Sequence, residues 1–206
     1  MAQKDKSLIQ YLPNALTVCR LVLTIGFLAM ILYAGRMDQQ KPAAFLLLAF
    51  IIFVITGLTD IVDGKIARKY SVTSKFGRMV DPLADKVLVC GAFVCFAVVG
   101  QPILQSFSFS STTITYLRWI TVGLVVTREL FVTILRHVAE ARGVNFAATV
   151  FGKIKMALQT FSIGTVMIKW AYVSRPWGDW FTLITYLLML TFTIISGVQS
   201  ITRPRK

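Results

Sequence analysis

The sequence is poor in the side chains that most often bind metals and in those that carry negative charge. It contains one histidine, His137, and three cysteines in no metal-ligand spacing, and only nine of its 206 residues are acidic, against 22 lysines and arginines. A metal centre built on histidine or cysteine is therefore not expected. We expect Cys19, Cys90 and Cys95, which lie within or beside apolar segments, to be small buried apolar residues.

Three long stretches lack charged residues. No aspartate, glutamate, lysine or arginine occurs in residues 42–59, 87–117 or 180–202. A helix that crosses a membrane needs roughly 20 predominantly apolar residues, so each stretch can contain one. The whole chain is 56% hydrophobic and 15% charged, with a mean hydropathy of +0.70. Soluble domains intersperse charge throughout, so this composition predicts an integral membrane protein.

Apolar segments define the predicted fold. Each is expected to be a transmembrane helix, because a helix satisfies its own backbone hydrogen bonds in lipid. The six segments are residues 14–33, 42–64, 80–99, 112–135, 151–173 and 180–202. Before them, residues 4–12 mix charged and apolar side chains, which is typical of a short juxtamembrane helix on the membrane surface. We therefore expect an all-α integral membrane protein, with a juxtamembrane segment 1–12 and one six-helix domain, 13–206.

Basic residues predict the orientation. They gather in residues 4–6, 65–78, 136–155 and 203–206, which all fall on one side of the predicted membrane. The positive-inside rule places this side, with both termini and the 65–78 loop, in the cytoplasm. The net charge of +13 is then explained by topology and contact with membrane lipids, and nucleic acid is not expected as a partner.

Four of the nine acidic residues lie in one window of 26 residues beside the 65–78 loop. Asp60 and Asp63 are three residues apart and Asp81 and Asp85 are four apart, so each pair projects from one helical face. Two helices joined by a short loop bring such faces together, and four clustered carboxylates repel one another unless cations neutralise them. Mg²⁺ or Mn²⁺ prefers such oxygen ligands. Two such ions roughly 3.5–4 Å apart clamp a phosphoryl group, so we predict a two-metal site.

Neighbouring residues suit a phosphate ligand. Gly64 and Gly77 have no side chain, so a nucleotide can approach the backbone closely, and Arg68 offers the fork geometry that matches phosphate. A simpler interpretation makes Asp81 a helix cap in front of Pro82. Capping explains one aspartate but not four at this spacing. Ionisable residues in membrane helices are costly and usually functional, so we favour a functional site.

The segment resembles the signature of the CDP-alcohol phosphotransferase family. In this sequence it reads Asp60-x2-Asp63-Gly64-x2-Ala67-Arg68-x8-Gly77-x3-Asp81-x3-Asp85. The resemblance implies that the four aspartates hold two metal ions that bind the CDP diphosphate, and that Asp85 deprotonates the acceptor alcohol. It also implies attack on the lipid-bearing phosphorus with CMP as leaving group, and a homodimer.

A second string, Pro13-Asn14-x2-Thr17-x2-Arg20, is similar to the family's stretch that contacts the CDP-lipid. The resemblance thus implies that Asn14 and Thr17 are ligand contacts, and it implies the same for Ser74 at the nucleotide. Ordinary helix capping remains open for the first two, and a solvated loop serine for the third.

Basic residues in the second half of the chain bear on the acceptor. Arg128 lies beside Glu129 inside the fourth apolar segment, Arg136 follows about two turns later, and Lys153 and Lys155 open the fifth segment. Such a basic group suits an acceptor that carries a phosphate. An internal Arg–Glu pair remains open for Arg128, and membrane anchoring for Arg136.

The strings Thr127-Arg128-Glu129-x6-Arg136 and Gly152-Lys153-Ile154-Lys155 resemble the bacterial branch of the family that uses glycerol 3-phosphate. Met156 departs from it, because threonine is expected there. The resemblance implies transfer of the phosphatidyl group of CDP-diacylglycerol to glycerol 3-phosphate in a bacterial cytoplasmic membrane, giving phosphatidylglycerol phosphate and CMP. Inositol phosphate or phosphatidylglycerol as acceptor remains an alternative, and a cation transporter a remote one.

Overall fold

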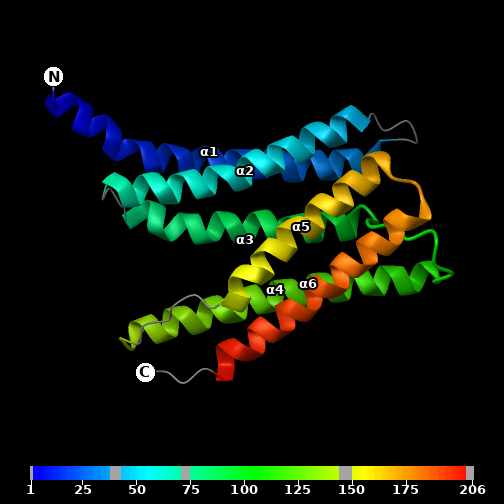
Figure 1. Cartoon of the computed structure of the whole chain (residues 1–206). Coiled ribbons are helices and arrows are strands. Elements are labelled where there is room, and N and C mark those ends of the chain that lie inside the picture. The colour runs from blue at the N-terminus through cyan, green and yellow to red at the C-terminus, as the bar shows by residue number, and fades with distance from the viewer. Residues whose placement is uncertain (1, 38–42, 71–74, 144–149, 203–206) are drawn as a thin grey trace. The chain divides into compact units, whose positions relative to one another are not determined.

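The computed structural model of the chain describes residues 2–37, 43–70, 75–143 and 150–202, with the backbone alone for 2–14, 16, 60–70, 75–82 and 140. This described part contains helices and no strand (Figure 1). The six helices are α1 (Ala2–Arg36), α2 (Ala43–Tyr70), α3 (Lys75–Val98), α4 (Ser111–Ala141), α5 (Val150–Tyr172) and α6 (Pro176–Thr202). They form two compact units, residues 1–92 and 93–206, and the boundary lies within α3.

Unit 1 is built on the packing of α1 along α2 (Figure 1). Phe27 and Phe53 meet between these helices with ring centroids 5.2 Å apart, and Leu46 is buried. On α3, Gly91 allows a close approach to α1, because a Cβ atom at this position would lie 2.7 Å from a methyl group of Leu28. Large apolar side chains of α1 thus fill the interior of this unit.

Unit 2 is built on α6, which packs along both α5 and α4 (Figure 1). Its apolar interior includes Ile163 and Met167 of α5 and Met189 of α6. Tyr186 of α6 packs edge-on against Phe93, with ring centroids 5.9 Å apart. These contacts are the ones expected where long apolar helices bury a shared face.

Buried hydroxyl groups on α6 are satisfied within the helix itself. Thr193 donates to the carbonyl of Met189 at 2.7 Å, Ser196 to that of Thr193 at 3.1 Å, and Ser200 to that of Ser196 at 2.7 Å. Serine and threonine commonly bond the preceding turn in this way when a helix lies in an apolar environment. These three hydroxyls therefore need no partner from another helix.

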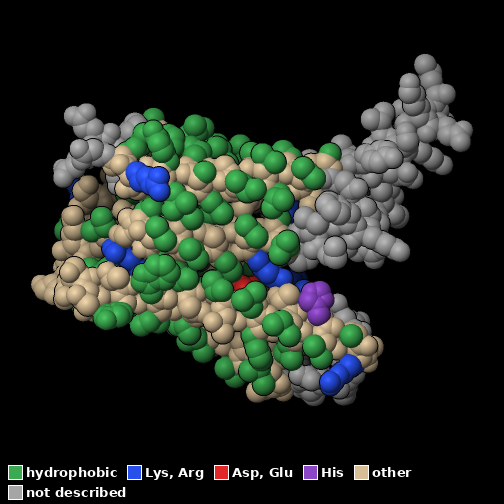
Figure 2. All heavy atoms as spheres, turned by 180° about the vertical axis from the view of Figure 1, so that it is seen from behind, with side chains coloured by type: hydrophobic (Ala, Val, Ile, Leu, Met, Phe, Trp, Pro, Cys, Tyr) green, Lys and Arg blue, Asp and Glu red, His purple; other side chains and the backbone are tan. Residues whose placement is uncertain are grey.

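Exposed large hydrophobic side chains occur on every helix, and the described atoms of the face shown in Figure 2 carry many of them with few charged groups among them. Two helices in the described part are long and apolar enough to cross a membrane, Thr17–Arg36 and Pro176–Thr202, and residues 43–59 form a shorter apolar helix. The prediction of an all-helical chain is confirmed for the described residues. Charged residues interrupt α4 and α5, which explains why these helices are not apolar enough over the length of a membrane span to be counted with the other two.

Helix ends differ from the predicted ones. The expected juxtamembrane helix is not a separate element, because α1 runs without a break from Ala2 to Arg36. No glycine separates the two segments, and α1 continues through Pro13 although a proline removes one backbone hydrogen bond from a helix. Likewise α2 continues to Tyr70 and α3 begins at Lys75, so most of the expected 65–78 loop is helical. Residues 65–70 contain neither glycine nor proline and are mostly good helix formers.

The three cysteines are free, but only Cys95 is buried; Cys90 is half-buried and Cys19 is exposed. The expectation that they are buried is confirmed for Cys95 and wrong for Cys19, which lies on an exposed part of α1 beside Val18.

Candidate active site

The aspartate motif occupies the two helix ends that flank residues 71–74. Asp60 and Asp63 lie in the last part of α2, and Asp81 and Asp85 in the first part of α3. Asp60 is ten residues before the end of α2, and Asp85 is ten residues after the start of α3. At 1.5 Å per residue, both are about 15 Å from the connection. The backbone therefore sets the two pairs at matching depths in unit 1.

The remaining motif residues lie partly outside the described residues. Gly64 and Arg68 belong to α2, Gly77 to α3 and Asn14 to α1 by their backbone. Ser74 lies outside the described residues altogether, as do the side chains of Asn14, Asp60, Asp63, Arg68 and Asp81. Among described side chains, no group of three or more histidine, cysteine, aspartate or glutamate residues gathers.

Asp85 is the motif aspartate whose side chain is described, and it forms an ion pair with Arg20. Arg20 Nη1 lies 3.4 Å from Asp85 Oδ1, with the arginine side chain 1% exposed and the aspartate 32% exposed. A buried guanidinium requires an anion close by, so the pair fixes α1 against the start of α3. The partly exposed carboxylate keeps oxygen accessible, which fits a hard divalent cation or a substrate hydroxyl.

Arg20 is a residue that the sequence reasoning did not select. It closes the string that begins at Pro13, and Thr17, three residues earlier on the same face of α1, is also buried. One feature of the sequence could have identified Arg20: it is a basic side chain within an apolar segment. Placing such a charge in a membrane helix is unfavourable unless it is paired or functional.

The predicted acceptor residues divide into two that join one largely buried group and two exposed residues. Glu129 of α4 accepts a hydrogen bond from Arg128 Nη1 at 3.1 Å and one from Lys155 Nζ of α5. These three side chains, the Glu129 group, are 13% (Arg128), 12% (Glu129) and 2% (Lys155) exposed. On α6, a Cβ atom built at Gly197 would lie 3.5 Å from Arg128 Cγ, an ordinary van der Waals distance, so α6 passes close to the apolar stem of the arginine.

Arg136 and Lys153 lie outside the Glu129 group. Arg136 is exposed about two turns beyond Arg128 on α4. Lys153 is exposed two residues before Lys155, which places it on a different face of α5. The structure thus brings Arg128 and Lys155 together through a shared carboxylate, and the internal Arg–Glu pair that the sequence left open is present.

The family model described as CDP-alcohol phosphatidyltransferase matches residues 10–195. The chain belongs to this family. The predicted family and enzyme class are therefore confirmed. The family generally depends on divalent metal ions, in agreement with the carboxylate-rich motif.

Relatives cover most of the chain. The CDP-diacylglycerol–glycerol-3-phosphate 3-phosphatidyltransferase of Bacillus subtilis is 33% identical over 195 residues, 90% of this chain and 91% of that protein. A probable phosphatidylglycerophosphate synthase of Mycobacterium tuberculosis is 32% identical over 192 residues, 93% of this chain and 80% of that protein. A Rickettsia typhi protein with the same name as the B. subtilis one is 30% identical over 157 residues, 76% of each chain.

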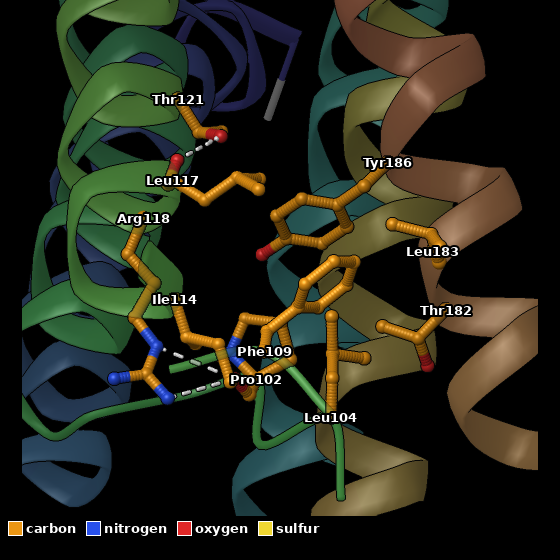
Figure 3. Close-up of a pocket in the computed structure, with 10 residues that line it drawn as sticks. All are labelled: Pro102, Leu104, Phe109, Ile114, Leu117, Arg118, Thr121, Thr182, Leu183 and Tyr186. Atoms are coloured by element: carbon orange, nitrogen blue, oxygen red, sulfur yellow. Dashed lines mark hydrogen bonds between the residues drawn. The ribbon is translucent and has the colours of Figure 1, made fainter. Parts of the chain in front are cut away.

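Unit 2 of this family member also contains an apolar pocket between residues 99–110, α4 and α6 (Figure 3). Arg118 lies at its edge and donates from Nε and Nη2 to the carbonyl of Pro102, at 3.3 and 2.9 Å. The ring of Tyr186 forms another wall. Arg118 precedes Arg128 by ten residues, about 15 Å along α4, and no predicted site residue lines the pocket. The pocket is therefore separate from the Glu129 group.

Proposed function

We propose that this protein transfers the phosphatidyl group of CDP-diacylglycerol to glycerol 3-phosphate, giving phosphatidylglycerol phosphate and CMP. The observation that carries the proposal is the Glu129 group, in which one largely buried carboxylate brings an arginine and a lysine together. A guanidinium and an ammonium group side by side can bind a phosphate through charge-assisted hydrogen bonds. The acceptor phosphate is such a ligand, in keeping with the names of the bacterial relatives.

The reaction assigns separate tasks to the two units. In unit 1, Asp85 removes the proton from the primary hydroxyl of glycerol 3-phosphate as that oxygen attacks the lipid-bearing phosphorus. The bond from this phosphorus to the oxygen of CMP breaks, and the electron pair leaves with CMP. Arg20 holds the Asp85 carboxylate in position through the 3.4 Å contact. In unit 2, Arg128 and Lys155 bind the acceptor phosphate.

The carboxylates of Asp60, Asp63, Asp81 and Asp85 form a donor set that suits two divalent ions, Mg²⁺ or Mn²⁺. When bound, such ions neutralise the diphosphate and polarise its phosphorus–oxygen bonds. We assign contacts with the rest of the CDP-lipid to residues of α1, α2, α3 and the connection between α2 and α3, namely Asn14, Thr17, Gly64, Arg68, Ser74 and Gly77. We assign the exposed Arg136 and Lys153 to attraction of the acceptor phosphate toward the Glu129 group.

The proposal includes the membrane arrangement. All six helices span a bacterial cytoplasmic membrane, with both termini and the aspartate motif on the cytoplasmic side, and the protein is a homodimer. Support comes from the two apolar helices that are long enough to span, and from the basic residues of 65–78 and 136–155.

The test is CMP release by purified protein in detergent with CDP-diacylglycerol and Mg²⁺. Glycerol 3-phosphate, inositol phosphate and phosphatidylglycerol are compared as acceptors. We expect activity with glycerol 3-phosphate alone, loss of activity with a chelator, and a fall of roughly 10²–10⁴-fold in kcat for Asp85→Asn. Thermal unfolding of the variant checks that it is folded. Activity with another acceptor alone would overturn the acceptor assignment, and no CMP from any acceptor would overturn the proposed reaction.

A further inference from the structure

Most buried polar atoms in the described part of unit 2 have partners. The hydroxyl of Ser162 on α5, for example, donates to the carbonyl of Thr185 on α6 at 3.3 Å. Among the described side chains of unit 2, three buried atoms have no hydrogen-bond partner: the donors Arg128 Nε and Gln159 Nε2, and the acceptor Gln199 Oε1. A buried donor without an acceptor is destabilising, so each such group calls for an explanation.

Both donors belong to the surroundings of the Glu129 group. Arg128 is a member of the group, and Gln159 lies four residues after Lys155 on α5, which places it on the same helical face. Its side chain is 1% exposed, so solvent does not satisfy it. One turn of α5, about 6 Å, separates the two positions along the helix axis. Lys155 and the unused amide donor of Gln159 thus follow one another on one buried face of α5.

We propose that Gln159 is a specificity residue that donates a hydrogen bond from Nε2 to the secondary hydroxyl of a phosphorylated polyol acceptor. This inference rests on the proposed function. Glycerol 3-phosphate carries a phosphate, a secondary hydroxyl that does not react and a primary hydroxyl that does. Arg128 Nε and Lys155 take the phosphate, and Gln159 takes the secondary hydroxyl. The bound acceptor then satisfies the two donors that have no partner within unit 2.

The test compares glycerol 3-phosphate with 1,3-propanediol monophosphate, which keeps the phosphate and the primary hydroxyl but lacks the secondary hydroxyl. For the unmodified protein we expect kcat/KM to be on the order of tenfold higher with glycerol 3-phosphate, the effect of one hydrogen bond. In Gln159→Leu the ratio falls to about one, because only the value for glycerol 3-phosphate decreases. The KM for CDP-diacylglycerol stays unchanged.

The thermal unfolding temperature provides a second measurement, and Gln159→Leu is not expected to lower it although the variant loses activity with glycerol 3-phosphate. Gln159→Leu keeps a similar side-chain size and removes an unpaired buried donor, so its thermal unfolding temperature in detergent is unchanged or higher. The matched control is Gln101→Leu, since Gln101 is also buried but lies in residues 99–110. The control keeps the acceptor ratio of the unmodified protein. An equal loss with both acceptors in Gln159→Leu, or an unchanged ratio, would overturn the assignment.

Failure of the proposed function is recognised separately. If the unmodified protein shows no turnover with glycerol 3-phosphate, the reaction assignment fails, and the Gln159 site is judged by binding alone. Glycerol 3-phosphate then raises the unfolding temperature of the unmodified protein, and this increase is smaller in Gln159→Leu. The same increase in both proteins, or none in either, would overturn the inference.

Discussion

Two carboxylates of unit 2, Asp179 and Glu129, each pair with a lysine of α5, but the donors around them are used differently. Asp179, in the first turn of α6, accepts hydrogen bonds from the N–H and the hydroxyl of Ser106, at 2.8 and 2.6 Å. It pairs with Lys169 at 2.5 Å, and Lys169 also donates to the carbonyl of Ile103. One anion faces one cation, and the group, here the Asp179 group, joins residues 99–110 to α5 and α6.

The Glu129 group has the same kind of acid–lysine contact but different surroundings. Its carboxylate pairs with Arg128 as well as Lys155. Arg128 Nε, and Gln159 Nε2 one turn beyond Lys155 on α5, have no hydrogen-bond partner. The donors of the Asp179 group are used on protein acceptors, which stabilises the fold. Unused buried donors give up stability and can serve a ligand, as expected at a functional site.

The largest effect is expected from Asp179→Asn, which leaves Lys169 without its counterion. We expect the free energy of unfolding to fall by about 3 kcal/mol, as when one partner of a buried pair is removed. The kcat/KM per folded molecule stays within about twofold, because the Asp179 group has no part in the reaction. Denaturant titration in mixed micelles, followed by CMP release, measures both. A hundredfold loss of activity at unchanged stability would contradict a structural role.

The next effect is expected from Lys155→Met, which keeps the apolar stem and removes the charge. Glu129 retains Arg128 as a partner, so the free energy of unfolding changes by less than about 1 kcal/mol. The kcat/KM for glycerol 3-phosphate falls about 100-fold, since charged hydrogen bonds are worth about 1.5–3 kcal/mol. Lys169→Met is the matched control, with the reverse pattern of lost stability and retained activity. Equal behaviour of the two variants would remove the distinction between the groups.

The smallest effect is expected from Ser106→Ala, which removes the hydroxyl donor to Asp179 and keeps the backbone one. The free energy of unfolding falls by about 1 kcal/mol, the usual net value of one hydrogen bond. CMP release per folded molecule is unchanged. Thermal unfolding in the same detergent detects this shift, and a change in the KM for glycerol 3-phosphate would show that the Asp179 group is coupled to the acceptor.

The sequence predicts the helices well because long apolar runs in this chain leave few alternatives. All six expected segments are helical, and errors occur at ends such as residues 65–70, where charged residues that favour helices were assigned to a loop. Membrane crossing by all six helices stays a prediction, as do the roles of the motif residues.

Contacts between helices were the least predictable feature. Residues at a fixed spacing, such as Asp81 and Asp85, lie on one face of a helix, so a single sequence reveals that they are close together. Which residue of another helix such a side chain contacts depends on how the helices pack. Lys155 and Glu129 are 26 residues apart, and no local pattern joins them. The partner of Arg20 was unpredictable for the same reason, because Asp85 is 65 residues away, although a basic side chain in an apolar segment already marks Arg20 itself.

The self-contained hydroxyls of α6 have a consequence for how this protein tolerates mutation. Thr193, Ser196 and Ser200 direct their hydrogen bonds to their own helix, so these three hydroxyls do not tie α6 to α4 or α5. The interface there depends on the shape of small side chains, and alanine reproduces that shape nearly as well. Many sequences can therefore build the last turns of α6, and divergence in this segment leaves the fold of unit 2 intact.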